Sequence, residues 1–105
     1  MGQSMFYITA EDTKEAENLA KQLVEERLVA CINIIPEMRS FFYWEGEAQN
    51  EAEVLMIGKT RTELIEKLVN RVKEIHSYDV PCVVSWEINN GNQEFLNWID
   101  VETSP

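Results

Sequence analysis

The residues able to do chemistry are few in this sequence. His76 is the only histidine, and it stands next to Ser77 and close to Tyr78 and Asp79 at the expected end of a helix. A histidine at that position is either a helix C-cap, which the helix dipole favours, or one ligand of a metal ion. Because transition metals usually take two or three protein side chains, His76 would need further donors, for instance from other subunits.

A lysine and a cluster of glutamates are the other charged residues that could bind a ligand. Lys59 comes at the end of an expected strand, where it is either solvated or lines a pocket beside an aromatic hairpin. Glutamates cluster around the turn of that hairpin, which is typical of a solvated tip that suppresses aggregation or of a weak site for hard cations. These glutamates are Glu45, Glu47, Glu51 and Glu53.

The sequence lacks the motifs of several enzyme classes. Cys31 and Cys82 match no zinc-site or CxxC spacing, so both are expected to be buried thiols. There is no Gly-x-Ser-x-Gly nucleophile elbow and no glycine-rich phosphate loop. We therefore expect no enzyme, and the alternative is a catalytic site with His76 as general base and Lys59 as electrostatic stabiliser.

The net charge of the chain indicates which classes of partner are favoured and which are disfavoured. The chain has 105 residues, and 19 Asp and Glu against 9 Lys and Arg give a formal net charge of −10. Such a surface attracts cations and repels phosphate backbones and anionic lipids, so no nucleic acid and no membrane is expected as a partner. The cysteine usage and the absence of a secretory apolar segment near the N-terminus predict a cytoplasmic protein.

Hydrophobic periodicity predicts the elements that position these residues. Asp12 with Glu15, and Thr60 with Glu63, resemble the capping boxes that start helices. Pro36 interrupts the most β-prone run and marks a bulge or an edge position. Strands are expected at 5–9, 29–35, 38–44, 52–59 and 81–88, and helices at 12–28, at 60–76 and in a short segment after Asn92.

The order of these elements predicts one α+β domain over residues 1–105, a ferredoxin-like βαββαβ sandwich with a long hairpin and a short C-terminal helix. Right-handed crossovers place the second strand at a sheet edge and both main helices on one face. The hairpin carries four consecutive aromatic residues at 41–44. An open sheet edge and exposed aromatic side chains are usually shielded by contact with another chain, so the sequence predicts a homo-oligomer.

Four segments closely resemble, in order and spacing, the motifs of the CutA divalent-cation-tolerance family. They are residues 28–36, 43–46, 57–60 and 76–81, and residues 95–99 fit as well, so the resemblance covers nearly the whole chain. It implies a ferredoxin-like subunit and a tight homotrimer similar to PII signalling proteins, in which the long hairpins pair between subunits.

The resemblance also implies a function. The chain would act in tolerance of divalent metal ions, with copper as candidate ligand and His76 as the carried-over metal ligand, and the downstream partner is left unknown. A copper-ligating cysteine of some members falls on Ile8 and a second histidine on Ile75, so this chain keeps one of three side chains. The alternative is a PII-like regulatory module that binds a small anionic ligand in an intersubunit cleft. The positions that match this cleft are Tyr43, Trp44, Lys59, Tyr78 and Trp98.

Overall fold

Alternating strands and helices build one four-stranded antiparallel sheet with strand order β2-β3-β1-β4. The structure is a computed structural model that describes residues 2–105. The elements are β1 (Gln3–Ala10), α1 (Thr13–Glu25), β2 (Cys31–Trp44), β3 (Glu47–Arg61), a 3-10 turn (Thr62–Leu64), α2 (Ile65–Ile75), β4 (Val83–Glu87) and α3 (Gln93–Glu102).

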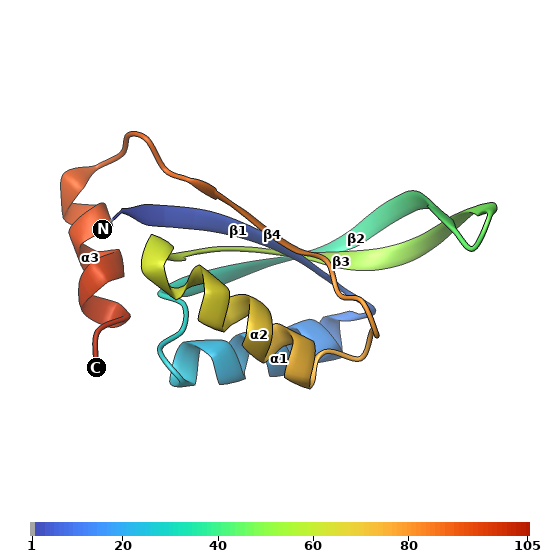
Figure 1. Cartoon of the computed structure of the whole chain (residues 1–105), viewed down its shortest axis with the longest axis horizontal. Helices are drawn as coiled ribbons and strands as arrows, with labels where there is room; N and C mark the ends of the chain where they lie inside the picture. Colours follow the sequence, from blue (N-terminus) through green and yellow to red (C-terminus); the bar gives the residue numbers. More distant parts are fainter. Residues whose placement is uncertain (1) are drawn as a thin grey trace.

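The layers are those of the predicted ferredoxin-like sandwich. Helices α1 and α2 lie side by side on one face of the sheet, and the long β2–β3 hairpin projects beyond them (Figure 1). This projection makes the chain elongated, with extents of 44 × 26 × 23 Å. The opposite face, called here the open sheet face, has no helix layer in Figure 1. Among residues 2–105, no helix combines the length and apolar content needed to cross a bilayer.

The core lies between the helix layer and the sheet. Alternation along β1 turns Phe6 and Ile8 toward the helices, and both are fully buried. Leu23 of α1 and Leu68 of α2 come from the apolar stripes of the helices and are also fully buried. Burial of this kind is worth roughly 1.5–3 kcal/mol for each large apolar side chain, so this layer supplies the main stabilisation of the fold.

The two predicted helix starts have different outcomes. The Asp12 carboxylate accepts a hydrogen bond of 2.8 Å from the backbone N–H of Glu15, as the capping box predicts. The prediction that Thr60 opens the second helix is wrong. Thr60 stays in β3, and its hydroxyl donates to the Leu28 carbonyl over 2.7 Å. Because that hydroxyl is engaged by the loop between α1 and β2, α2 begins later, after a 3-10 turn without a side-chain cap.

The β2–β3 hairpin is the longest element pair, and its irregularities fall where expected. The register shifts between Ile35 and Met38, so Pro36 marks a bulge, and Glu37 there has a positive φ of 66°. The turn is made by Glu45 and Gly46, with φ values of 51° and 82° that match a tight hairpin turn. Beyond the bulge the two strands pair only with each other, because β1 ends opposite Val54.

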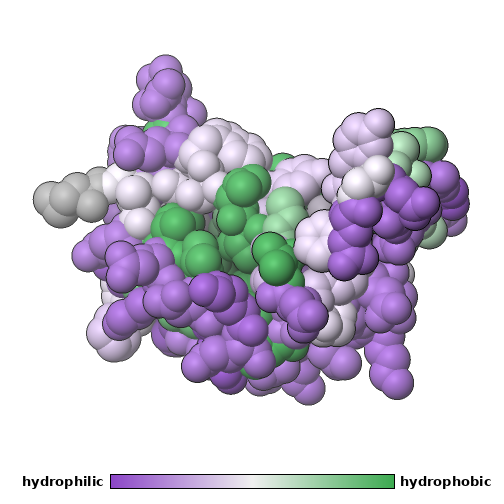
Figure 2. Space-filling model, turned by 45° about the vertical axis from the view of Figure 1, so that its right-hand side comes forward, coloured by the Kyte–Doolittle hydropathy of each residue, from purple (hydrophilic) through white to green (hydrophobic). Residues whose placement is uncertain are grey.

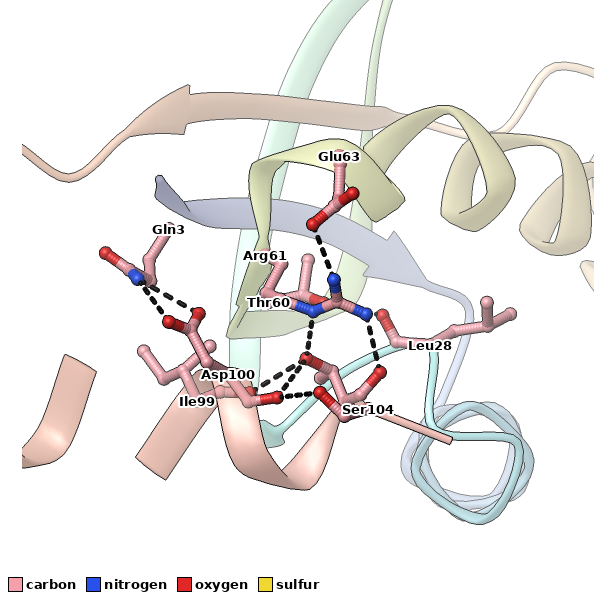
Figure 3. Close-up of polar contacts among 9 residues, drawn as sticks. Gln3, Leu28, Thr60, Arg61, Glu63, Ile99, Asp100 and Ser104 are labelled. Atoms are coloured by element: carbon pink, nitrogen blue, oxygen red, sulfur yellow. Dashed lines mark hydrogen bonds and ion pairs between the residues drawn. The ribbon is translucent and has the colours of Figure 1, made fainter. Parts of the chain in front are cut away.

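Helix α3 is fastened to the end of the sheet by polar contacts (Figure 3). Arg61 at the end of β3 donates from Nε to the Thr103 hydroxyl and from Nη2 to the Thr103 carbonyl, both over 2.8 Å. The Gln3 amide donates to the Asp100 carboxylate over 3.0 Å. These contacts hold α3 beside the start of β1 and the end of β3.

Candidate functional site

His76 follows the last turn of α2 and is held on both sides of its ring. Its Nε2 lies 2.7 Å from the Thr9 carbonyl, and the backbone N–H of Tyr78 donates to its Nδ1 over 3.0 Å. A carbonyl only accepts, so Nε2 carries the proton and Nδ1 supplies the lone pair of a neutral imidazole. The predicted position at the helix C-terminus is confirmed, since the His76 N–H also bonds to Val72. A metal at His76 would have to displace one of these hydrogen bonds.

Glu15 of α1 holds the loop that carries His76. Its Oε2 accepts from the Ser77 N–H over 2.8 Å and lies 3.8 Å from His76 Nδ1, while Oε1 accepts from the Glu11 N–H over 3.0 Å. Burial alone would raise the pKa of Glu15, but the hydrogen bonds with Ser77 and Glu11 outweigh it and the pKa is lowered. The loop after α2 is therefore tied to the start of α1.

Tyr78 links this loop to the hairpin. Its hydroxyl donates to Glu53 Oε2 over 2.8 Å, and its ring centroid lies 4.7 Å from that of His76. Burial, this hydrogen bond and the nearby charges of Glu53 and Glu51 raise the pKa of Tyr78. The prediction of four solvated glutamates is wrong for Glu53, which is buried because Tyr78 covers it. The other three are exposed.

A cavity of about 390 Å³ lies where the hairpin leaves the sheet, and we call it the acidic cavity. It has three carboxylates and three aromatic rings in its wall. Its lining consists of Thr9, Phe42, Trp44, Gln49, Glu51, Glu53, Tyr78, Asp79, Val80 and Cys82. Burial, and then the charge of Glu53, raise the pKa of the Cys82 thiol. Cys82 and Cys31 are both free and only half-buried, so their expected full burial is wrong.

A second cavity, of about 510 Å³, lies between α3 and β4 and contains Lys59, and we call it the Lys59 cavity. The Lys59 Nζ lies 5.9 Å from the centroid of the Phe95 ring, within reach of a cation–π interaction. Trp86, Glu87 and the turn at 88–92 form much of the remaining wall, together with Met5, Leu96 and Ile99. Lys59 is therefore a pocket residue, one of the two alternatives that the sequence left open.

The five predicted cleft residues do not share one cavity within a subunit. Trp44 and Tyr78 line the acidic cavity, and Lys59 lines the other. The ring centroids of Trp98 and Phe95 lie 5.3 Å apart, and Trp98 lines a separate pocket. Tyr43 lies on the opposite face of the hairpin from Trp44, because side chains alternate along a strand. Only the assembly of several copies could bring the five together.

The described residues of one chain do not form a metal centre. Across residues 2–105, no three His, Cys, Asp or Glu side chains are placed to hold a metal ion together. Ile8, at the position of the family's first-strand cysteine, is fully buried in the core and offers no donor. Donors for a divalent cation would therefore have to come from more than one copy of the chain.

Sequence reasoning missed most of the acidic cavity. Cys82 was considered only as a thiol, and Asp79 only as a neighbour of His76. The partnership of Glu53 with Tyr78 depends on the register of β3 after the bulge, because one residue of slippage would turn Glu53 to the other face. The signal available in the sequence was the alternation of Glu51 and Glu53 on one face of β3.

The family model of the CutA1 divalent ion tolerance protein matches residues 4–102. The chain belongs to the CutA1 family. It is 46% identical over 97 residues to a divalent-cation tolerance protein CutA of Archaeoglobus fulgidus, covering 92% of this chain and 94% of the relative. A relative of the same description from Thermus thermophilus is 44% identical over 96 residues, covering 91% and 93%.

Solved CutA structures have the same fold. The crystal structure of CutA1 from Oryza sativa superposes with a TM-score of 0.96 at 38% identity, covering 99% of this chain and 95% of that one. The structure of the periplasmic divalent cation tolerance protein CutA from Archaeoglobus fulgidus gives 0.94 at 44% identity, covering 97% and 99%. The predicted family and ferredoxin-like α+β fold are therefore confirmed.

The predicted cytoplasmic location is wrong as an inference from this sequence. The Archaeoglobus fulgidus relative is described as periplasmic, and CutA relatives of Oryza sativa and Arabidopsis thaliana are described as chloroplastic. The physical reason is that targeting depends on segments that do not take part in the fold. The composition of the folded domain therefore carries no signal for the compartment.

Proposed function

We propose that this protein acts in divalent-cation tolerance by binding a divalent cation as a homotrimer. Membership of the CutA1 family carries the proposal, and the net charge of −10 supports it because that field concentrates cations near the surface. Since the described residues of one chain supply no three-donor group, the proposed site takes donors from neighbouring copies. Copper is the candidate ion and His76 the candidate imidazole ligand.

Unpaired strand edges and exposed aromatic rings support the homotrimer. Within residues 2–105, strands β2 and β4 are the two edges of the sheet, and neither has a second strand partner. Beyond the bulge the hairpin is a two-stranded ribbon, which is marginally stable alone. Phe41 and Tyr43 on that ribbon are 77% and 79% exposed. Contact with other copies would pair the edges and cover the rings.

A copper titration tests the proposed cation binding. Metal-free protein is titrated with Cu²⁺ by calorimetry beside His76→Ala and His76→Gln, the second of which keeps a hydrogen-bonding amide. We expect saturable binding by the wild type and a loss of at least about tenfold in affinity in both variants. Glu45→Gln, a change at the exposed hairpin turn, is the control and should bind normally. An absence of saturable binding by the assembled wild type would refute the proposal.

A PII-like regulatory role is the second candidate, and the Lys59 cavity favours it. Lys59 is the cation in that cavity, and Phe95 and Trp86 offer flat surfaces for stacking. A small anionic metabolite that binds there should raise the melting temperature of the wild type and not that of Lys59→Gln. A panel of anionic metabolites that shifts both proteins equally, or neither, would exclude this role.

We also propose that the protein is not an enzyme. The alternative pairing of His76 as general base with Lys59 is unfavourable because the two lie at different places on the sheet. His76 bonds to Thr9, which pairs with Leu55, and Lys59 lies four residues further along β3. This register separates the two positions by roughly 13 Å along the strand.

A further inference from the structure

We propose that the acidic cavity binds a small organic ammonium ion. The inference goes beyond metal tolerance and beyond the anionic ligand of the Lys59 cavity, because it concerns a different cavity with the opposite charge preference. It depends on the shape of the cavity, on the kinds of side chain in its wall, and on the hydrogen bond between Tyr78 and Glu53.

The charge of the wall selects for a cation. Glu51, Glu53 and Asp79 all line the cavity, and no Lys or Arg among the described residues does so. The pKa values of Tyr78 and Cys82 in the same wall are both raised, first by burial and then by Glu53. An anion would face three carboxylates there without any counter-charge.

The aromatic rings distinguish an organic cation from a metal ion. Phe42, Trp44 and Tyr78 contribute ring surfaces, and such surfaces attract ammonium groups by cation–π interaction while they offer no donor to a metal. The cavity volume of about 390 Å³ falls in the range of small-molecule sites and far exceeds one ion. The carboxylates also form no three-donor group among residues 2–105.

Glu53 provides the fixed anchor of the site. The side chain is buried, and Tyr78 donates to its Oε2 over 2.8 Å, which fixes the position of the carboxylate. No other hydrogen bond to this carboxylate is formed by the described residues, so Oε1 remains available as an acceptor. A bound ammonium group would donate to Oε1 while Trp44 and Phe42 pack against its alkyl chain.

The two strands of the hairpin and the loop before β4 must be in place together for this site to exist. Trp44 and Phe42 come from β2, Glu51 and Glu53 from β3, and Tyr78 from the loop after α2. Because Tyr78 ties that loop to β3, the wall is formed before any ligand arrives. Preformed sites avoid an ordering cost on binding, so even a small amine can be held.

Three probes of matched size test the inference on the assembled wild-type protein. Butylammonium, 1-butanol and butyrate each contain four carbon atoms and differ in charge. Titrations followed by calorimetry and by tryptophan fluorescence should give saturable binding of butylammonium with a dissociation constant of about 1 mM or tighter. We expect 1-butanol to bind at least about tenfold more weakly and butyrate not at all. Added NaCl should weaken butylammonium binding by screening.

Variants locate the binding in the acidic cavity. Glu53→Gln keeps an acceptor for Tyr78 and removes the charge, and Trp44→Leu removes a ring, so each should weaken butylammonium binding at least about tenfold. Trp86→Leu, in the Lys59 cavity, is the matched control and should leave the affinity unchanged. Sedimentation checks that each variant keeps the assembly of the wild type, and Glu51→Gln replaces either of the two acidic-cavity variants if it does not.

Three results would overturn the inference. Butylammonium and 1-butanol could bind equally, the two cavity variants could bind like the wild type, or no butylammonium could bind because another copy of the chain fills the cavity. None of these results bears on Cu²⁺ binding, which the copper titration measures separately. Failure of the ammonium site is therefore distinguishable from failure of the proposed metal function.

Discussion

At the residue scale, a few buried or half-buried polar side chains connect the loop after α2 to the rest of the fold. His76, Glu15 and Tyr78 each hold a partner from a distant part of the sequence, namely Thr9, Ser77 and Glu53. The residue types were visible in the sequence, and the single histidine was correctly placed at a helix end. Their partners were not, because hydrogen bonds that span 25 to 67 residues of chain follow from tertiary packing and not from local pattern.

Glu15 should make stability depend on pH below its usual pKa of 4.5. Its pKa is lowered in the fold, so the folded state favours the carboxylate, and this stabilisation is complete above about pH 4.5 and is lost as the pH falls further. Glu15→Gln should lower the free energy of unfolding by about 1 kcal/mol at pH 7. In urea melts the difference from the wild type should shrink toward acid pH. The exposed Glu17→Gln on the same helix should show neither effect.

Gly58 is required by close packing rather than by backbone conformation. A methyl group there would overlap the Phe6 ring and the Cys31 carbonyl oxygen, and neither can retreat from the core. Gly58→Ala should therefore lower the free energy of unfolding by at least about 2 kcal/mol. Gly91→Ala is the control, because its methyl group would meet Leu96 at an ordinary 3.6 Å. Equal thermal stability of the two variants would contradict this packing.

At the element scale, the sequence predicted which elements exist and in what order, and it failed at their ends. Strand β3 runs to Arg61 because Thr60 bonds to Leu28 in the loop after α1, an interaction that outweighs the local capping signal. Helix α1 ends at Glu25, three residues before the expected end, and Arg27 then adopts a positive φ of 58°. Local sequence patterns describe one element at a time, whereas the ends of these elements depend on contacts with other segments of the chain.

Helix α3 should depend on Arg61 for its position. Arg61→Met removes both hydrogen bonds to Thr103 and should weaken the attachment of α3 to the sheet. We expect the free energy of unfolding to fall by about 1–3 kcal/mol. Backbone amides of α3 should then exchange hydrogen faster in mass spectrometry. Because α3 carries Phe95, the Lys59 cavity should open at the same time. Arg71→Met, which breaks contacts to Glu26 and Glu74 instead, should leave α3 protected.

At the scale of the whole molecule, one chain presents incomplete surfaces. Figure 2 shows apolar residues gathered in the middle of one face, with hydrophilic residues around them. The exposed large apolar residues include Val84 and Trp86 on the β4 edge and Ile35 on β2. The sequence predicts an oligomer through the aromatic run and the open edge, and the exposed rings agree with that prediction. It does not predict which side chains would contact another copy, because the register after the bulge decides which side chains face outward.

The exposed rings of the hairpin should be needed for assembly. Phe41→Asp and Tyr43→Asp each place a charge on side chains that are more than three-quarters exposed in one subunit, at 77% and 79%. Both variants should sediment as smaller species, since a charge buried in an interface without a partner is strongly unfavourable. Val101→Asp, which is 64% exposed on α3, is the control and should assemble normally. Normal assembly of both hairpin variants would show that these side chains of the hairpin are not part of the interface.

The molecular mass of the wild-type protein in solution tests the central claim most directly. The proposed metal site needs donors from several copies, and only assembly could unite the predicted cleft residues. Sedimentation equilibrium at micromolar concentration should give three times the 12.2 kDa mass of the chain. A mass of 12.2 kDa over the same concentration range would contradict the trimer and, with it, a cation site shared between subunits.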